Sequence, residues 1–139
     1  MLFPALILLG SPAIYQPKLG SPERKAQMDA LRKKVLPGLR QTVVFKVAWL
    51  RSDGTAAFLY GRPTRPDGKA VDYRKTIYAD AKREGMFDDN VSALFRKKGG
   101  KWTVNEWTLG ATDVPWDGMW TRKHLPRALF PGVGFAGVN

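Results

Sequence analysis

The chain contains no cysteine and only one histidine, His124. The absence of thiols excludes disulfide bridges, thiolate zinc sites and cysteine nucleophiles, and a single imidazole excludes a histidine-rich metal site. The acidic residues Asp80, Asp88 and Asp89 do not have the ligand spacing of a known calcium loop. We therefore expect no metal ion and no other cofactor.

Acidic residues are scarce relative to basic ones. The sequence has 12 Asp and Glu against 23 Lys and Arg, which gives a formal net charge of +11. A charge excess of this size raises the local concentration of any polyanion. Nucleic acid, anionic lipid, acidic polysaccharide and acidic proteins are all compatible partners, and charge alone does not rank them.

The 139 residues, of which 44% are hydrophobic and 25% charged, are typical of one folded domain. Residues 1–13, MLFPALILLGSPA, are apolar and uncharged, as in the hydrophobic part of a secretory signal, and are too short to span a bilayer. However, the basic start of a signal is missing, and Pro4 and Pro12 interrupt the run. We interpret residues 1–20 as a leader remnant and linker, which predicts a periplasmic or secreted protein. The alternative, an ordinary first strand, predicts a cytoplasmic one.

A helix is expected from Ser21, because a capping serine is followed by proline at the first helical position and by an acid. Met28, Leu31 and Val35 form one apolar stripe, and Pro37-Gly38 should end the helix. We interpret its basic side as a solvated face, made of Arg24, Lys25, Arg32, Lys33 and Lys34.

Two hairpins are expected. Residues 41–51 and 56–61 alternate in polarity around the turn Ser52-Asp53-Gly54. In the first strand the apolar face should comprise Val43, Phe45, Val47 and Trp49, and in the second Phe58 and Tyr60.

The second hairpin turns at Lys98-Gly99-Gly100-Lys101, since two glycines accept the positive φ angles of a primed turn. Counting outwards, this turn places Lys97 opposite Trp102, Phe95 opposite Val104 and Leu94 opposite Asn105.

Regular structure is harder to predict elsewhere. We expect residues 62–68, which contain two prolines, to form an exposed basic loop. In residues 70–85, Tyr73, Ile77 and Ala81 fit one helical stripe, whereas 73–78 fit a short strand equally well. Beyond Trp107 the prolines exclude long elements, so we expect a short helix near 117–124 and a loose tail at 131–139.

The predicted fold class is α+β. One N-terminal helix packs on a curved, roughly four-stranded antiparallel sheet, with an irregular Trp-rich C-terminal tail, and residues 21–130 form the single domain. The segments SPERKAQMDALRKKV, VVFKVAWLRSDGTAAFLYG and KKGGKWTVNEWTLGATDVPWDGMW together resemble small exported bacterial domains of the cystatin-like and nuclear-transport-factor-like group. Enzymes of this broad fold place acid–base residues in a pocket between helix and sheet. No position here matches them, so the resemblance carries over no catalytic residue.

Candidate binding residues are the basic side chains of the second hairpin and three tryptophans. Trp and Arg are favoured interface anchors. The alternative is that the C-terminal tryptophans fold back as a lid on the core. The binding set is Arg96, Lys97, Lys98, Lys101, Trp102, Trp116 and Trp120, and a second basic cluster comprises Arg62, Arg65, Lys69, Arg74 and Lys75.

Gly110, Thr112 and Asp113 are predicted to form a structural corner. They directly follow a strand, where short polar side chains commonly bond to nearby backbone amides.

Three function classes remain. The favoured one is a non-catalytic exported binding or accessory module of a bacterial envelope, with a protein or anionic polymer as ligand and no transmembrane span. The first alternative is a nucleic-acid-binding protein that uses the basic hairpin and loop. The least favoured is a small acid–base enzyme in which His124 works with Asp113 or Asp117. We predict that the protein is not an enzyme.

Overall fold

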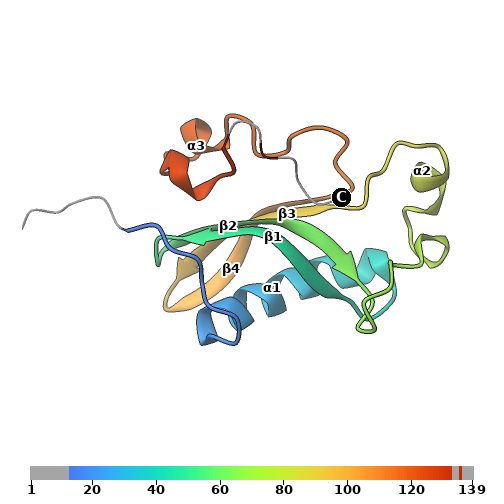
Figure 1. Ribbon diagram of the computed structural model, residues 1–139, viewed down its shortest axis with the longest axis horizontal. Helices are drawn as coiled ribbons and strands as arrows, with labels where there is room; N and C mark the ends of the chain where they lie inside the picture. Colours follow the sequence, from blue (N-terminus) through green and yellow to red (C-terminus); the bar gives the residue numbers. More distant parts are fainter. Residues whose placement is uncertain (1–12, 133–134, 136–139) are drawn as a thin grey trace, which may run out of the picture.

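The computed structural model describes residues 13–132 and 135. Helix α1 crosses one face of an antiparallel sheet, and the C-terminal segment lies over the other face (Figure 1). The predicted α+β fold is therefore confirmed. The elements in chain order are α1 (Pro22–Leu39), β1 (Val44–Ser52), β2 (Ala56–Thr64), the 3₁₀ helix η1 (Tyr73–Lys75), α2 (Ala79–Arg83), β3 (Val91–Lys98), β4 (Lys101–Leu109), α3 (Met119–Arg122) and the 3₁₀ helix η2 (Arg127–Leu129).

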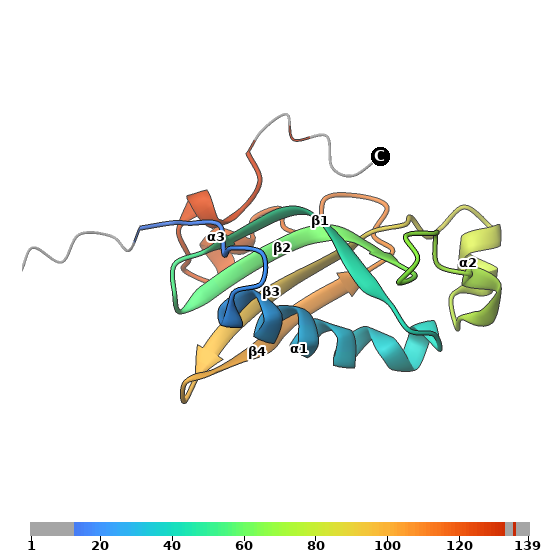
Figure 2. The same ribbon diagram turned by 60° about the horizontal axis from the view of Figure 1, so that its bottom comes forward.

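The sheet has the strand order β1-β2-β3-β4, with every neighbouring pair antiparallel. Each strand follows its neighbour in the chain, so β1 and β4 are the two edges. Figure 2 shows α1 running beneath these strands, with the α2 segment at one end of the sheet and the β3–β4 turn at the other.

Helix α1 begins as predicted. The Ser21 side chain accepts a hydrogen bond from the backbone N–H of Arg24 at 3.2 Å, and Leu31 and Val35 are fully buried. The predicted end at Pro37-Gly38 was wrong, because the helix continues to Leu39. A proline in the last turn removes only one internal hydrogen bond, so the helix tolerates it there.

Edge strand β1 contains a bulge between Val47 and Trp49. Because side chains alternate along a strand, the extra residue turns Trp49 to the face opposite α1, while Val47 stays on the α1 side. The prediction of one face shared by Trp49 and Val47 was therefore wrong. Trp49 instead donates from Nε1 to the carbonyl of Leu129 at 2.8 Å.

The β3–β4 hairpin confirms the predicted turn, with positive φ angles of 55° and 77° at Gly99 and Gly100. Lys97 faces Trp102 and Phe95 faces Val104, as expected. Leu94 faces Glu106 rather than Asn105, because a second bulge shifts the register of edge strand β4. This bulge brings Trp102 and Trp107 to the same, α1-facing side of the sheet.

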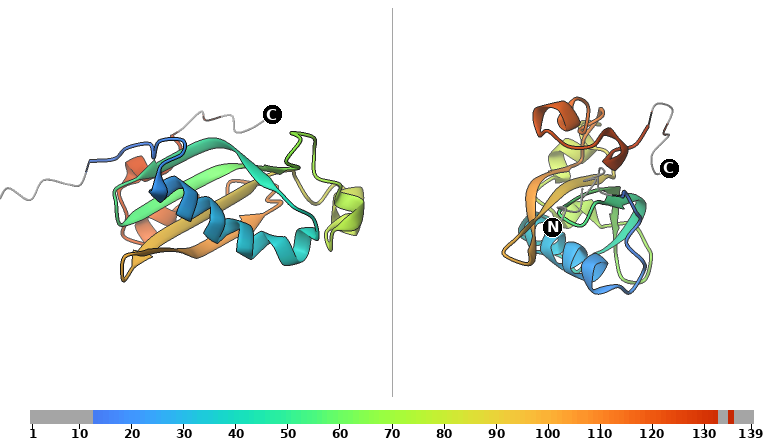
Figure 3. Two further views of the ribbon diagram at one scale, coloured as in Figure 1. Left: turned by 90° about the horizontal axis from the view of Figure 1, so that it is seen from below. Right: turned by 90° about the vertical axis from the view of Figure 1, so that its left-hand side faces the viewer.

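Each face of the sheet has its own core. On the α1 side the buried residues include Leu31, Leu59 and Phe95. On the other side the C-terminal segment forms a lid, in which Trp116 and Met119 pack against Phe58 and Leu94 from the sheet. Figure 3, in its right-hand view, shows the three layers in the order α1, sheet and lid. Strand β2 and strand β3 are thus buried on both faces.

The ends of the chain were predicted as linker and tail. Residues 14–20 are not a free linker, because Tyr15 exchanges two backbone hydrogen bonds with Ser52 at 2.9 and 2.8 Å. Phe135 packs on Trp49 and Tyr60. Most of the predicted leader, residues 1–12, and most of the loose tail, at 133–134 and 136–139, lie outside the described residues.

The segment between β2 and β3 forms neither one helix nor a strand. It contains the two short helical elements η1 and α2. Tyr73 is buried, whereas Ile77 is 58% exposed, so the predicted stripe through both residues was wrong. The segment is anchored to the α1–β1 connection, where the Gln41 side chain bonds to the backbone carbonyl of Asp72 at 3.0 Å and to its N–H at 2.9 Å.

Candidate anion-binding groove

A shallow groove lies between α1 and the β3–β4 hairpin. It consists of two adjoining depressions of about 370 and 410 Å³ that share Trp102. We call it the Trp102 groove and define it by Lys33 and Lys34 from α1 and by Lys97, Lys101 and Trp102 from the hairpin.

The groove exists because small side chains of α1 face β4. Ala26 and Ala30, one helical turn apart, line the first and the second depression respectively. Residues four apart lie on one helix face, and a methyl group fills little of the space between helix and strand. Trp102 is only partly buried there, packed against the α1-side core.

The charge of the groove is largely uncompensated. Its four lysines are exposed, and none of them forms an ion pair with a carboxylate of residues 13–132. On the same helix, by contrast, Asp29 pairs with Lys25 and with Arg32, each at 2.8 Å, and these two neighbours, Lys25 first, lower the pKa of Asp29.

Glu23 is the acidic residue that lines the groove. Its carboxylate is already engaged, since it accepts hydrogen bonds from the Tyr15 hydroxyl and, at 3.2 Å, from Nε2 of Gln27. The lysines are therefore available for an external anion. Ammonium groups on flexible stems act as adaptable point charges, so such a groove suits an anionic chain better than one rigid small molecule.

The predicted binding residues separate into groups. Lys97, Lys101 and Trp102 line the groove, and Lys98 does not. In the strand register Lys97 is paired with Trp102, and Lys98 with Lys101. Arg96 points to the opposite face of the sheet, where its Nη2 donates to the carbonyl of Lys123 at 3.3 Å.

The C-terminal tryptophans belong to the lid and also line a depression of about 420 Å³ in it. Trp116 is 8% exposed and packs on Phe58 and Tyr60, with ring centroids 5.9 and 4.8 Å apart. Trp120 is partly buried, and the Arg127 guanidinium lies 4.0 Å from its ring centroid. Neither residue adjoins the Trp102 groove.

Two groove residues were missed by the sequence interpretation. Lys33 and Lys34 were assigned to a solvated helix face, yet they lie beside Trp102 of a strand far away in the chain. The only local signal was their spacing from Ala26 and Ala30, which places all four on one side of α1.

The predicted corner depends on another residue. The Asn90 side chain donates to the carbonyl of Ala111 at 2.7 Å and accepts from its N–H at 3.0 Å, while Thr112 and Asp113 are exposed. Gly110 has a φ of 84°, and a Cβ there would lie 2.1 Å from the Phe87 ring. The corner thus requires Gly110 and is held by Asn90.

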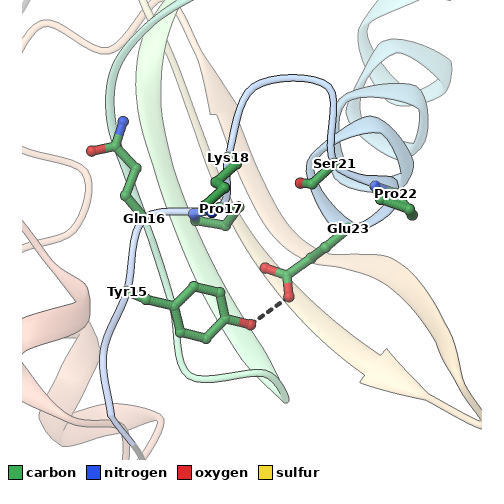
Figure 4. Close-up of a pocket in the computed structure, with 7 residues that line it drawn as sticks. All are labelled: Tyr15, Gln16, Pro17, Lys18, Ser21, Pro22 and Glu23. Carbon is green, nitrogen blue, oxygen red and sulfur yellow. Dashed lines mark hydrogen bonds between the residues drawn. The ribbon is translucent and has the colours of Figure 1, made fainter.

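A more apolar depression of about 380 Å³ adjoins the groove through Pro22 and Glu23. Figure 4 shows the Tyr15 hydroxyl pointing at the Glu23 carboxylate, with Pro17 and Pro22 nearby. Partial burial, and then the hydrogen bond to Glu23, raise the pKa of Tyr15. This depression can receive an apolar group. Among its lining residues, Lys18 is the basic one.

No contact among the described residues supports the acid–base arrangement suggested for His124. His124 is exposed, with a φ of 54°, and no hydrogen bond there joins it to Asp113 or Asp117. In the described part of the chain no group of three or more His, Asp or Glu residues is arranged to hold a metal ion.

Among the described helices, none combines the length and the apolar character needed to cross a membrane. No protein-family model, curated protein or solved structure matches this chain. The resemblance to cystatin-like domains stays a prediction.

Proposed function

We propose that this domain is a non-catalytic binding module that holds an anionic polymer in the Trp102 groove. The observation that supports this most is that four exposed lysines from α1 and the β3–β4 hairpin line two depressions that share one partly buried tryptophan. None of these lysines has a carboxylate partner among the described residues.

The several exposed charges along the groove favour a polymer as the ligand. Individual exposed charges contribute little to affinity, and useful binding requires several contacts along one chain.

We further propose that the polymer belongs to a bacterial envelope, because the apolar residues 1–13 are typical of an export signal. Recovery of a periplasmic form whose intact mass corresponds to cleavage near Ala13 would support export, and a full-length cytoplasmic form would contradict it.

Binding to heparin, used as a defined acidic polysaccharide, tests the proposal. The double variants Lys33→Gln/Lys34→Gln and Lys97→Gln/Lys101→Gln should each weaken binding by about five-fold or more at physiological salt, because each removes two contacts. The control Lys46→Gln/Lys69→Gln removes the same charge from exposed positions outside the groove and should change binding less than about two-fold. Equal losses of heparin affinity in all three variants would mean that binding depends only on net charge. This result would overturn the proposal that the Trp102 groove is the binding site.

Single-stranded nucleic acid is the second candidate ligand, because Trp102 lies among lysines and bases stack on aromatic rings. The variant Trp102→Leu distinguishes the two. A loss of about 1–3 kcal/mol in binding to an oligothymidylate, with heparin affinity unchanged, would indicate base stacking and favour nucleic acid. Similar, small losses for both probes would favour the polysaccharide.

A further inference from the structure

A second basic depression lies at the other end of the molecule. It has a volume of about 380 Å³ and is lined by Tyr73 and Arg74 of η1 and by Ala79, Lys82 and Arg83 of α2. Figure 1 and Figure 2 both place α2 at the end of the sheet opposite the β3–β4 turn, so this depression is separate from the Trp102 groove. We call it the Tyr73 pocket.

Tyr73 provides a fixed wall of the pocket. Its side chain is 9% exposed, its hydroxyl donates to the Asp89 carboxylate, and the Phe87 ring meets it edge-on at 5.2 Å between centroids. The Tyr78 ring stacks on the Phe87 ring, with 4.8 Å between their centroids. The pocket wall is therefore held by the core and does not depend on the ligand for its shape.

The rim of the pocket carries three cations. The Lys82 ammonium lies 5.2 Å from the centroid of the Tyr73 ring and has no carboxylate partner among the described residues. Arg74 pairs with Asp72 at 3.0 Å, and Arg83 pairs with Asp80. The Arg83–Asp80 pair is exposed on both sides, at 71% and 82%, and pairs of this kind are weak. The guanidinium of Arg74 is already engaged, because its Nε and Nη2 donate to the two carboxylate oxygens of Asp72 at 3.0 and 3.1 Å.

Apart from these charges, the lining is mostly apolar. It consists of the Tyr73 ring, the Ala79 methyl group and the hydrocarbon stems of the basic residues. A pocket of this composition suits a ligand that has both an anionic and an apolar group. The anionic group would contact the basic residues at the rim, and the apolar group would pack against the Tyr73 ring. Inorganic phosphate alone would make only the first of these contacts.

We propose that the Tyr73 pocket binds a small anion that carries an apolar group, with a phosphate or carboxylate held by Lys82 and Arg83 at the rim. This site is independent of the proposed polymer binding, and either can fail without the other. It also involves one residue of the second basic cluster, Arg74, which lines the Tyr73 pocket and not the Trp102 groove.

Phenyl phosphate is the probe, and amide chemical shifts of the isotopically labelled full chain are the readout. Phenyl phosphate should shift the amides of residues 73–83 and bind about ten-fold more tightly than either inorganic phosphate or phenol, since it fills both parts of the pocket. Equal affinity for phenyl phosphate and inorganic phosphate would overturn the bipartite pocket. Shifts centred on Trp102 instead of residues 73–83 would also overturn the proposal.

Two variants with a matched control identify the residues responsible. Lys82→Gln removes the cation that has no carboxylate partner among the described residues. Ala79→Leu fills the pocket without changing charge or helix propensity appreciably. Each variant should weaken phenyl phosphate binding at least five-fold. Lys75→Gln removes a neighbouring exposed charge that does not line the pocket and should leave binding unchanged. Unchanged affinity in Ala79→Leu, with the fold verified from its spectrum, would contradict the site.

The two proposals are separated by crossing their variants. Lys97→Gln/Lys101→Gln should lose heparin binding and keep phenyl phosphate binding, and Lys82→Gln should do the reverse. If Lys97→Gln/Lys101→Gln weakens phenyl phosphate binding as much as Lys82→Gln does, there is no separate Tyr73 pocket.

Discussion

The carboxamide of Asn90 closes the corner after β4 by forming two hydrogen bonds with the backbone of Ala111, one donated at 2.7 Å and one accepted at 3.0 Å. Asn90 is 8% exposed, so water cannot easily replace these bonds. The start of β3 and the segment that leads into the lid are thereby joined by one side chain.

Asn90→Ala should lower the free energy of unfolding by about 1–3 kcal/mol, because it leaves the N–H and the carbonyl of Ala111 without this partner. Urea denaturation measures the change. Asn105→Ala is the control, since Asn105 is exposed at the β4 bulge, and it should change stability by less than about 0.5 kcal/mol. A similar loss in both variants would show that Asn90 has no special role.

Gly110→Ala should be more damaging than the same substitution at another glycine of positive φ. A Cβ at Gly110 would lie 2.1 Å from the buried Phe87 ring, and φ there is 84°. At Gly85, with a φ of 73°, a Cβ would meet nothing within 4 Å. We expect Gly85→Ala to cost about 1–2 kcal/mol from backbone strain alone, and Gly110→Ala to cost at least about 2 kcal/mol more. Thermal unfolding of the two variants tests this, and equal melting temperatures would contradict the close contact.

The sequence predicted those features that neighbouring residues determine. The start of α1 follows from Ser21 and Pro22, and the β3–β4 turn follows from Gly99 and Gly100, since capping and turn geometry depend on the local chain. The buried stripe through Leu31 also follows from helical spacing.

The features that sequence reasoning missed arise from long-range packing. The bulges in β1 and β4 reverse the alternation of side chains and thereby move Trp49 and Trp107, yet no residue type marks a bulge reliably. The Trp102 groove depends on α1 lying against β4, so the meeting of Lys33 with Trp102 could not be derived from either segment alone.

Trp116 should behave as a core residue and not as a binding residue. It is 8% exposed and contacts Phe58 and Tyr60, so Trp116→Ala should lower the free energy of unfolding by about 3–5 kcal/mol. Val114→Ala, at a position 52% exposed in the same segment, should have little effect. Guanidinium denaturation measures both variants. A stable Trp116→Ala protein with weakened ligand binding would instead assign Trp116 to an interface.

The stability of the fold should fall in alkaline solution because of Tyr73. Burial, and then the hydrogen bond to Asp89, raise the pKa of Tyr73 well above its ordinary value of 10.0. The folded protein therefore keeps this proton at pH values where the unfolded chain has lost it, so the unfolded state binds fewer protons and the free energy of unfolding decreases as pH rises above about 10. Below that pH the contribution is complete.

Urea denaturation at pH 8, 10 and 11 measures this dependence, and Tyr73→Phe isolates it from the titration of lysines and other tyrosines. At pH 8 the variant should be less stable than the parent, because the hydrogen bond to Asp89 is lost. Since phenylalanine has no proton to lose, the difference between the two proteins should shrink as pH rises from 10 to 11. A difference that stays constant over this range would show that the Tyr73 hydroxyl ionises equally in the folded and unfolded states, contrary to its burial beside Asp89.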